Sequence, residues 1–430
     1  MSRTSSYQVR SAVIVVVVGL LGTLALAATL LDPSPTEYSA PHTLVDLAEF
    51  DGSKQINNPF YAPASPPAGM APGTLLKHEP IAGAPDGIRA ERFTYVSQTA
   101  DGTPNVVSGM YAVRLGPPAG PNGRPLVAFA HGTTGIAPGC GVSQAPFVPM
   151  STGFGTWTQE MSGLVGAGFA VVATDYANMG VPGTPDYLVM NGEGHDVLDS
   201  IRAAYQLDRA GLDTSKTAIM GHSQGGHSAL SASYIAPSYA PDIALKGTVA
   251  ISPAIFPPAP LLIKFIQSGP DSEAPSFLGF ISDAVNSWAA NYPDQVQLSD
   301  VFTPKGVQAA KVGLTGCSDE INKAFVGPKK DFVAATIPPS LLAVAQQNFP
   351  IYAKYAHPLL IQQGLKDTTV VPGVNLAAAR TFCKQGSTVN LQTFPDDVHS
   401  SVLYTGQPEA IDWLNDRFNG KPAKDDCGGM

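Results

Sequence analysis

The most constraining feature of this sequence is a series of short apolar runs, each ending in glycine or a polar residue. Such runs occupy residues 125–132, 168–176, 217–223, 247–253, 357–367 and 387–399. Helical patterns, such as residues 194–207, lie between them, and an amphipathic pattern at 408–419 predicts a closing helix. Buried apolar strands that alternate with helices are typical of a parallel sheet. The sequence therefore predicts an α/β fold in which helices flank a mostly parallel central sheet.

One long stretch, residues 253–345, interrupts this alternation. It contains short apolar patches, among them 261–266 (LLIKFI) and 277–281 (FLGFI), which Pro and Gly residues separate. We interpret the stretch as a helical cap inserted into a core that comprises residues 76–252 and 346–430. The alternative is that these patches simply pack on one another.

The N-terminus has the pattern of an export signal. Arg3 and Arg10 accompany a polar start, and an uncharged apolar run over 11–31 contains a small-x-small cleavage site that ends at Ala27. We predict a signal peptide over residues 1–27 and a secreted protein. The alternative is a signal anchor in the cell envelope, because about 20 apolar residues can span a bilayer.

Residues 28–75 are rich in proline and show no periodic pattern, which predicts an extended arm. Two β-rich runs follow over 91–115, and the Asp101-Gly102 pair between them predicts a hairpin. The net charge of -9 over 430 residues, of which 14% are charged, argues against a nucleic-acid partner.

The four cysteines allow three pairings. We expect disulfides between Cys140 and Cys317 and between Cys383 and Cys427, because an exported chain meets an oxidising compartment. Free buried thiols are the alternative. The cysteines lack the spacing of a zinc or redox motif, and the sequence contains no His-Glu-x-x-His pattern and no glycine-rich phosphate loop. We therefore expect neither a metal nor a cofactor.

Residues 221–225 (GHSQG) have the pattern of a nucleophile elbow, in which a serine lies on a sharp turn between a strand and a helix. An apolar strand pattern precedes this segment, and a helix-compatible Ala- and Ser-rich segment follows it. Gly221 and Gly225 are needed because side chains two positions before and after the serine would collide in so tight a turn. We therefore predict that Ser223 is a nucleophile.

A nucleophilic serine needs a base, and folds of this kind supply the catalytic partners in the order Ser, acid, His. Histidines before the elbow, and those within it, are excluded by this order. His357 precedes the strand that should carry the acid, which leaves His399 after the last strand. The eight histidines are His42, His78, His131, His195, His222, His227, His357 and His399.

The acid should follow the strand before the last one, and Asp367 stands there. Asp396 and Asp397 are so close to His399 in the sequence that they would struggle to reach the far imidazole nitrogen. We therefore predict that Asp367 orients His399. The alternative is that Asp367 is a turn or helix-capping residue.

Negative charge that develops on the substrate oxygen needs backbone N–H donors. We predict that Gln224, directly after the nucleophile, supplies one donor and that Thr133, in the loop after residues 125–132, supplies the other. A Cys140–Cys317 bridge would tie this loop to the cap. We interpret His131, His195 and His227 as structural residues.

The chain resembles the secretory lipases of the lipase A type, which are α/β-hydrolases. The resemblance rests on residues 58–77, 192–204, 221–229 and 363–372 together with the order of the four cysteines. It implies an extracellular hydrolase of carboxylic esters, often triacylglycerols, with a helical cap that shapes an acyl tunnel. It also implies the same triad and the same disulfides, with ester or lipid substrates and transient contact with a lipid interface.

The residues and the resemblance together predict a secreted serine ester hydrolase, either a lipase or a carboxylesterase. One alternative is another acyl-transfer reaction on the same fold, such as peptidase or acyltransferase activity, because the triad does not select between amide, alcohol and water. A second alternative is a non-catalytic envelope-binding protein on a hydrolase scaffold. The ordered set of Ser223, Asp367 and His399 argues against this second alternative.

Overall fold

The computed structural model describes residues 58–118, 120–147, 160–255, 274–350 and 354–430. The chain divides into two compact units, Met1–His42 and Thr43–Met430, and all described residues lie in the second. Several sequence predictions lie outside the described residues, namely the signal peptide over 1–27, the alternative anchor over 11–31, most of the arm over 28–75 and the patch at 261–266.

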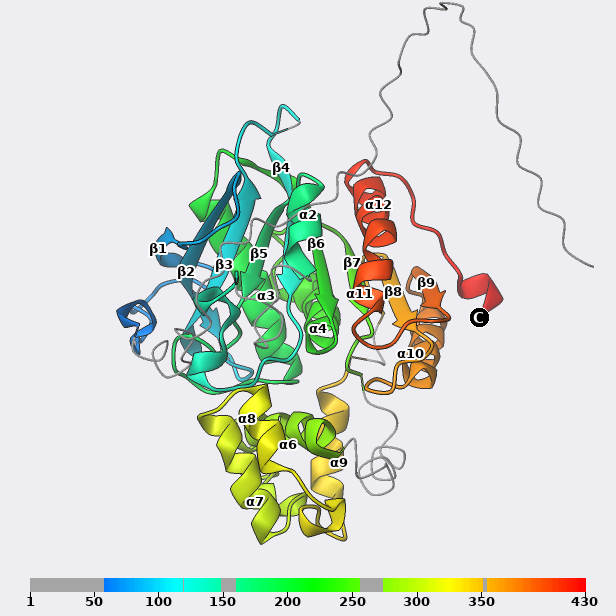
Figure 1. The fold of residues 1–430 in the computed structure, drawn as a ribbon. Helices are drawn as coiled ribbons and strands as arrows, with labels where there is room; N and C mark the ends of the chain where they lie inside the picture. Colours follow the sequence, from blue (N-terminus) through cyan, green and yellow to red (C-terminus); the bar gives the residue numbers. More distant parts are fainter. Residues whose placement is uncertain (1–57, 119, 148–159, 256–273, 351–353) are drawn as a thin grey trace, which may run out of the picture. The chain divides into compact units, whose positions relative to one another are not determined.

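A nine-stranded sheet forms the centre of the described residues (Figure 1). Its spatial order is β1-β2-β3-β5-β4-β6-β7-β8-β9. The six strands β5, β4, β6, β7, β8 and β9 are parallel to one another. At one edge, β1, β2 and β3 pair antiparallel, and β3 also pairs antiparallel with β5. The mostly parallel sheet is thus confirmed. The strands are β1 (Leu75–Pro80), β2 (Ile88–Gln98), β3 (Pro104–Arg114), β4 (Arg124–Ala130), β5 (Ala170–Thr174), β6 (Leu212–His222), β7 (Leu245–Ile251), β8 (Leu359–Gly364) and β9 (Val389–Phe394).

The predicted hairpin around Asp101-Gly102 joins β2 and β3, so this prediction is confirmed. Gly102 has φ of 87°, a backbone conformation that glycine adopts without steric cost. Asp101 Oδ1 accepts hydrogen bonds from Thr99 Oγ1 (2.6 Å) and from the Thr103 N–H (3.0 Å), which fixes the turn.

Helices cover both faces of the sheet (Figure 1), which explains why its central strands read as continuous apolar runs. One face carries α3 (Met190–Leu207), α4 (Gln224–Tyr239) and α10 (Pro372–Lys384), and the other carries α2 (Ser162–Gly166), α11 (Val402–Thr405) and α12 (Gln407–Phe418). Along β4, Leu126 and Ala128 pack on the face with α3 and α4, whereas Val127 and Phe129 pack on the face with α2 and α12. Short 3-10 helices occupy Pro59–Tyr61, Pro138–Cys140, Val142–Gln144, Leu298–Asp300, Lys311–Leu314, Lys329–Asp331 and Cys427–Gly429.

Between β7 and β8 the described chain forms helices and no strand of the sheet. We call residues 274–347 the cap; it lies at one end of the sheet in Figure 1. Its buried side chains, such as Leu278, Trp288 and Phe325, form one cluster with Leu230 of α4 and Ile361 of β8, so the cap packs directly on the core. Its helices are α6 (Ala274–Asn291), α7 (Pro304–Ala310), α8 (Ser318–Ala324) and α9 (Pro339–Gln347). The domain boundaries at 253 and 345 stay predictions.

Two disulfides form, and their pairing is the expected one. Cys140, in the loop after β4, is bonded to Cys317, which precedes α8 of the cap. Beside this bond the Ser318 N–H donates to the Thr134 carbonyl at 3.0 Å. The second bond joins Cys383 of α10 to Cys427. The first disulfide therefore ties the loop after β4 to the cap.

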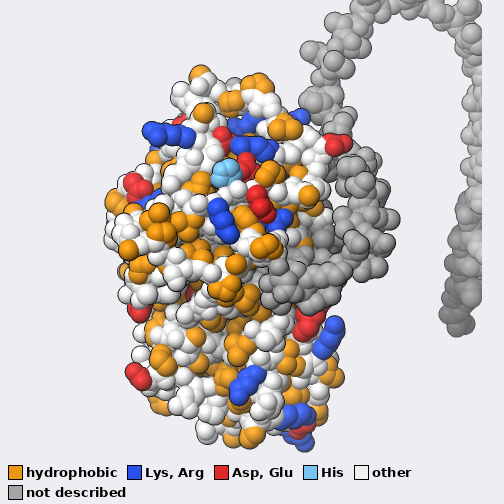
Figure 2. All heavy atoms as spheres, turned by 90° about the vertical axis from the view of Figure 1, so that its left-hand side faces the viewer, with side chains coloured by type: hydrophobic (Ala, Val, Ile, Leu, Met, Phe, Trp, Pro, Cys, Tyr) orange, Lys and Arg blue, Asp and Glu red, His pale blue; other side chains and the backbone are white. Residues whose placement is uncertain are grey.

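The surface carries few charged side chains, in keeping with the 14% of charged residues in the sequence. Figure 2 shows them scattered among apolar and neutral side chains on one face of the molecule. Over the described part of the chain, no helix has the length and apolar character needed to cross a membrane.

Candidate active site

Ser223 lies between the end of β6 and the start of α4, at φ 57° and ψ -118°. A residue other than glycine in this region costs of order 1–3 kcal/mol and persists only where the surroundings hold it. Three backbone hydrogen bonds hold Ser223: its N–H donates to Ile251 O (3.0 Å), and its carbonyl accepts from His227 N (3.1 Å) and Ala254 N (2.9 Å). These bonds hold Ser223 in its strained conformation at the end of β6.

The glycines of the elbow are required by close backbone approach. A Cβ on Gly221 would collide with the carbonyl oxygen of Gly225, and a Cβ on Gly225 would collide with the carbonyl oxygen of Ala130. Neither neighbour is a flexible side chain, so no other residue fits at these two positions without moving β4 or α4.

His399 and Asp367 come together from the loops after adjacent strands, β9 and β8. His399 Nδ1 lies 2.7 Å from Asp367 Oδ2. The other carboxylate oxygen of Asp367 accepts from the N–H groups of Thr369 (2.9 Å) and Val370 (2.8 Å). Burial opposes ionisation of Asp367, but the hydrogen bonds from His399 and Val370 and the charge on the imidazole outweigh it and lower the pKa. Asp367 is therefore an ionised partner for the imidazole.

The two carboxylates that the sequence argument set aside do not contact the imidazole. Asp396 pairs with Lys366 at 2.7 Å on the surface. Asp397 accepts from the hydroxyl groups of Ser401 (2.6 Å), which precedes α11, and Thr405 (2.5 Å), which ends it.

His222 connects the elbow to the histidine loop. Its Nε2 lies 2.9 Å from the backbone oxygen of His399, and the two imidazole rings are 4.7 Å apart at their centroids. Because a carbonyl oxygen only accepts, Nε2 of His222 carries a proton. Burial and the nearby charge of His399 lower the pKa of His222 to about 3, so the ring is neutral.

Ser223 Oγ and the His399 ring make no mutual hydrogen bond within the described residues. In proteins without bound substrate such bonds are often long and tighten only when the substrate binds. The His222 contact places His399 next to the elbow, and the hydrogen bond to Asp367 sets the orientation of its ring.

Thr133 and Gln224, the expected oxyanion donors, are both held through their side chains. Thr133 Oγ1 lies 2.9 Å from the Tyr187 hydroxyl, and Gln224 Nε2 donates to Glu193 Oε1 at 2.8 Å. The loop that carries Thr133 passes close to the elbow, because a Cβ on Gly132 would lie 3.5 Å from the His222 ring. That their backbone N–H groups bind an oxyanion stays a prediction.

The structure also shows supporting residues that the sequence argument did not identify. Gln363 Nε2 donates to Asp367 Oδ2 at 3.2 Å, and Asn375 Nδ2 donates to Gln363 Oε1 at 2.6 Å. A sequence signal for Gln363 exists, because Gln362 and Gln363 are consecutive amides in the otherwise apolar strand β8, where both are fully buried. Over the described part of the chain, no group of three or more His, Cys, Asp or Glu side chains is arranged to hold a metal ion.

Glu160 is a second unexpected residue near the site. Its Oε1 lies 3.8 Å from His222 Nδ1, and burial raises the pKa of this carboxyl to about 8. The carboxyl is therefore largely protonated at neutral pH. No motif in the sequence marks it.

The buried titratable groups predict that stability falls as pH rises from about 6.5 to about 8. Burial raises the pKa of Glu160 to about 8 and that of Asp196 to about 7, whereas it lowers the pKa of His131 to about 4 and that of His222 to about 3. Above about pH 6.5 these histidines are neutral in the folded state and mostly neutral in the unfolded state, whereas the two carboxyls hold protons only in the folded state. Unfolding then releases protons, so rising pH favours the unfolded state.

Thermal melts across this pH range test the effect. We expect Tm to fall from pH 6.5 to pH 8, and Glu160→Gln to flatten that dependence because glutamine does not titrate. A Tm that rises with pH in the parent protein, or an unchanged slope in the variant, would contradict this assignment.

The elbow and the His399–Asp367 pair lie at the same end of the sheet of an α/β-hydrolase fold. A family model of secretory lipases matches residues 151–426, so the chain belongs to the secretory lipase family. Lipase 6 of Candida albicans is 27% identical over 285 residues, which cover 61% of this chain and 58% of that protein. A secreted triacylglycerol lipase of Malassezia globosa is 25% identical over 250 residues, which cover 55% of this chain and 53% of that protein. The matched region thus spans little more than half the length of these relatives.

Solved structures share the fold. Candida antarctica lipase A in its closed state superposes with a TM-score of 0.67 at 18% identity, covering 87% of this chain and 89% of that chain. The rice cell wall degrading esterase LipA from Xanthomonas oryzae gives a TM-score of 0.66 at 19% identity, covering 82% of this chain and 100% of that chain. The α/β-hydrolase fold predicted from the sequence is confirmed.

Proposed function

We propose that this chain hydrolyses carboxylic esters, triacylglycerols among them, through an acyl-enzyme formed on Ser223. The observation that carries the proposal is the 2.7 Å hydrogen bond between His399 Nδ1 and Asp367 Oδ2 beside the strained elbow. Membership of the secretory lipase family supports it, as do relatives that are named triacylglycerol lipases.

In this mechanism Ser223 Oγ attacks the ester carbonyl carbon while His399 Nε2 takes the hydroxyl proton. The tetrahedral intermediate collapses when His399 returns the proton to the leaving alcohol oxygen, and water then repeats the sequence on the acyl-enzyme. Asp367 keeps the other imidazole proton on Nδ1 and stabilises the imidazolium that forms. The lowered pKa of Asp367 suits this role because an ionised carboxylate must face that cation.

The backbone N–H groups of Gln224 and Thr133 donate to the oxyanion in the proposed mechanism. Loss of one such donor typically costs about 3–4 kcal/mol of activation free energy, so both segments need firm support. The hydrogen bond of Thr133 to Tyr187 and that of Gln224 to Glu193 are consistent with this need.

The surroundings of the site favour an apolar substrate. Four of the nine large apolar side chains exposed among the described residues belong to the two loops and the short helix around Asp367 and His399. Exposed apolar side chains of this kind favour transient contact with a lipid interface. In this proposal, apolar residues of the cap form the acyl-binding site. The four residues are Leu365, Val371, Val398 and Tyr404.

We further propose that the protein is secreted. Two disulfides support an oxidising compartment, and the family is one of secretory lipases with relatives that are named as secreted. Cleavage near Ala27 is the proposed route.

Initial rates on p-nitrophenyl esters from acetate to palmitate test the proposal. We expect hydrolysis with a maximum at medium or long acyl chains, which would indicate a lipase with an extended acyl site. A maximum at acetate or butyrate would indicate a carboxylesterase with a shallow pocket. Absence of hydrolysis across the series would contradict the proposal and favour a peptidase, an acyltransferase or a binding protein.

The Cys140–Cys317 disulfide is predicted to affect activity as well as stability, unlike the second disulfide. Replacing both Cys140 and Cys317 with serine should lower the free energy of unfolding by about 3–5 kcal/mol, because the bond closes a long loop in the unfolded chain. It should also lower kcat, because this bond ties the loop that carries Thr133 to the cap.

Replacing both Cys383 and Cys427 provides the matched control, since that bond lies away from the elbow and should affect stability alone. Ester hydrolysis assayed well below each Tm separates the two effects. An equal kcat for both double variants would show that the first disulfide does not support catalysis.

A further inference from the structure

A fully buried carboxylate, Glu193, lies behind the elbow at the start of α3. Its Oε1 accepts from Gln224 Nε2 (2.8 Å) and from the Leu188 N–H (3.0 Å). Its Oε2 lies 2.6 Å from His227 Nδ1 and accepts from Ser228 Oγ (2.8 Å). Four partners thus fill the usual acceptor positions of one carboxylate, and three of them lie in the first turns of α4, directly after Ser223.

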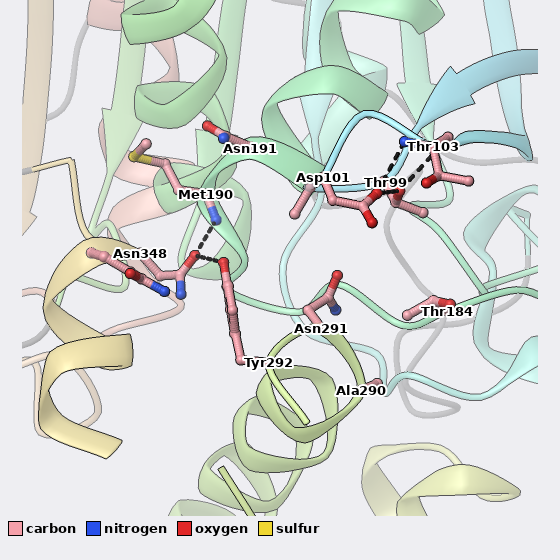
Figure 3. Close-up of a pocket in the computed structure, with 12 residues that line it drawn as sticks. Thr99, Asp101, Thr103, Thr184, Met190, Asn191, Ala290, Asn291, Tyr292 and Asn348 are labelled. Carbon is pink, nitrogen blue, oxygen red and sulfur yellow. Dashed lines mark hydrogen bonds between the residues drawn. The ribbon is translucent and has the colours of Figure 1, made fainter. Parts of the chain in front are cut away.

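The same cluster reaches the cap side of the molecule through His227. His227 Nε2 donates to the backbone oxygen of Asn348, 2.7 Å away, just after α9. Asn348 Oδ1 in turn accepts from the Met190 N–H (3.0 Å) and the Tyr292 hydroxyl (3.1 Å), as Figure 3 shows. A chain of hydrogen bonds therefore runs from the elbow helix through Glu193 and His227 to the end of the cap.

The hydrogen-bond cluster around Glu193 bears on catalysis through Gln224. Its side chain is bonded to Glu193, and its backbone N–H is the proposed oxyanion donor. Such a donor must lie about 2.7–3.1 Å from the developing oxyanion, so a small shift of the first turn of α4 weakens it. Glu193 is fully buried, and a buried carboxylate that loses its partners is strongly unfavourable, so these hydrogen bonds oppose any shift of the first turn of α4.

We propose that Glu193 is a positioning residue for the oxyanion hole, which fixes Gln224 relative to the cap through His227 and Asn348. This inference rests on the proposed ester hydrolysis at Ser223. Glu193 does not touch the substrate; it acts by holding the turn that presents the Gln224 N–H.

Glu193→Gln tests the inference, because glutamine keeps the shape but turns one acceptor into a donor that faces other donors. We expect kcat on a p-nitrophenyl ester to fall about 10- to 100-fold, within the range for a weakened oxyanion donor, while KM changes less than about threefold. Affinity for a trifluoromethyl ketone, which forms a tetrahedral oxyanion on the serine, should fall by a similar factor. A purely structural role would leave kcat and this affinity unchanged.

Asp199→Asn is the matched control. Asp199 is also a buried carboxylate on α3, but its partners are Ser97, Tyr239 and Arg202, which are not part of the elbow. We expect this variant to lose stability and to keep its kcat. Gln224→Met is the second test variant, because it removes only the side-chain bond to Glu193; it should reproduce the loss in kcat even where Glu193→Gln does not fold.

The outcomes separate this inference from the proposed function. Ser223-dependent hydrolysis with unchanged kcat in Glu193→Gln or in Gln224→Met would overturn the positioning role alone. An equal fall in kcat for Asp199→Asn would also overturn it, since the effect would then be general loss of rigidity. Absence of Ser223-dependent hydrolysis in the parent protein would overturn the proposed function, and the positioning role with it.

Discussion

Ser223→Ala is expected to lower kcat for ester hydrolysis by about 10⁶-fold, the size of effect seen when a serine nucleophile is removed from a triad. Without Oγ no acyl-enzyme forms, and the remaining rate comes from binding and from the oxyanion donors alone. The fold should be retained, because alanine has the same Cβ in the same strained conformation and the Ser223 hydroxyl makes no hydrogen bond within the described residues.

Initial rates with a p-nitrophenyl ester, measured beside thermal melts, check this result. Ser231→Ala is the matched control: Ser231 lies on the same helix and its buried hydroxyl has no partner among the described residues, so the variant should keep full activity. Hydrolysis by Ser223→Ala at the parent rate would mean that the elbow is not the site of chemistry.

Asp367→Asn should lower kcat by about 10⁴-fold while leaving the fold intact. The amide oxygen of asparagine can still accept from the Thr369 and Val370 N–H groups, so its NH₂ group would face His399. His399 Nδ1 would then have to accept, which puts the imidazole proton on Nε2, the nitrogen that must take the proton from Ser223. The variant thus holds the wrong tautomer for a general base.

Steady-state kinetics on the same ester give the measurement, with Asp396→Asn as the control. Asp396 is an exposed carboxylate that pairs with Lys366, so its loss should change kcat little. A loss below tenfold in Asp367→Asn, or a comparable loss in both variants, would rule out Asp367 as the partner of His399.

The sequence predicted the fold and the arrangement of the loops at the site because both depend on local patterns and on chain order. Apolar runs that end in polar residues placed β4, β6, β8 and β9 in a parallel sheet, whose carboxyl ends lie at one edge. The order Ser, acid, His then selected Asp367 and His399, and the structure joins these two by a hydrogen bond. Four cysteines alone allow three pairings, and the pairing that we expect is also the one that the family resemblance implies.

The supporting residues could not be predicted in the same way. Glu160, Glu193 and Gln363 bear on the site through contacts between segments far apart in the sequence. A buried polar residue signals that a partner exists, but the sequence does not identify the partner. His227 shows this limit: the sequence indicates only a structural role, and the hydrogen bonds of His227 to Glu193 and Asn348 reveal what it connects.

Labelling with a fluorophosphonate, followed by peptide mass mapping, tests the central claim most directly, because the reagent reacts with an activated serine whatever the natural substrate is. We predict one adduct on the peptide that contains Ser223, loss of ester hydrolysis in proportion to labelling, and no adduct in Ser223→Ala. Ester hydrolysis that persists after full labelling, or an adduct on a different residue, would contradict the assignment of Ser223 as the nucleophile.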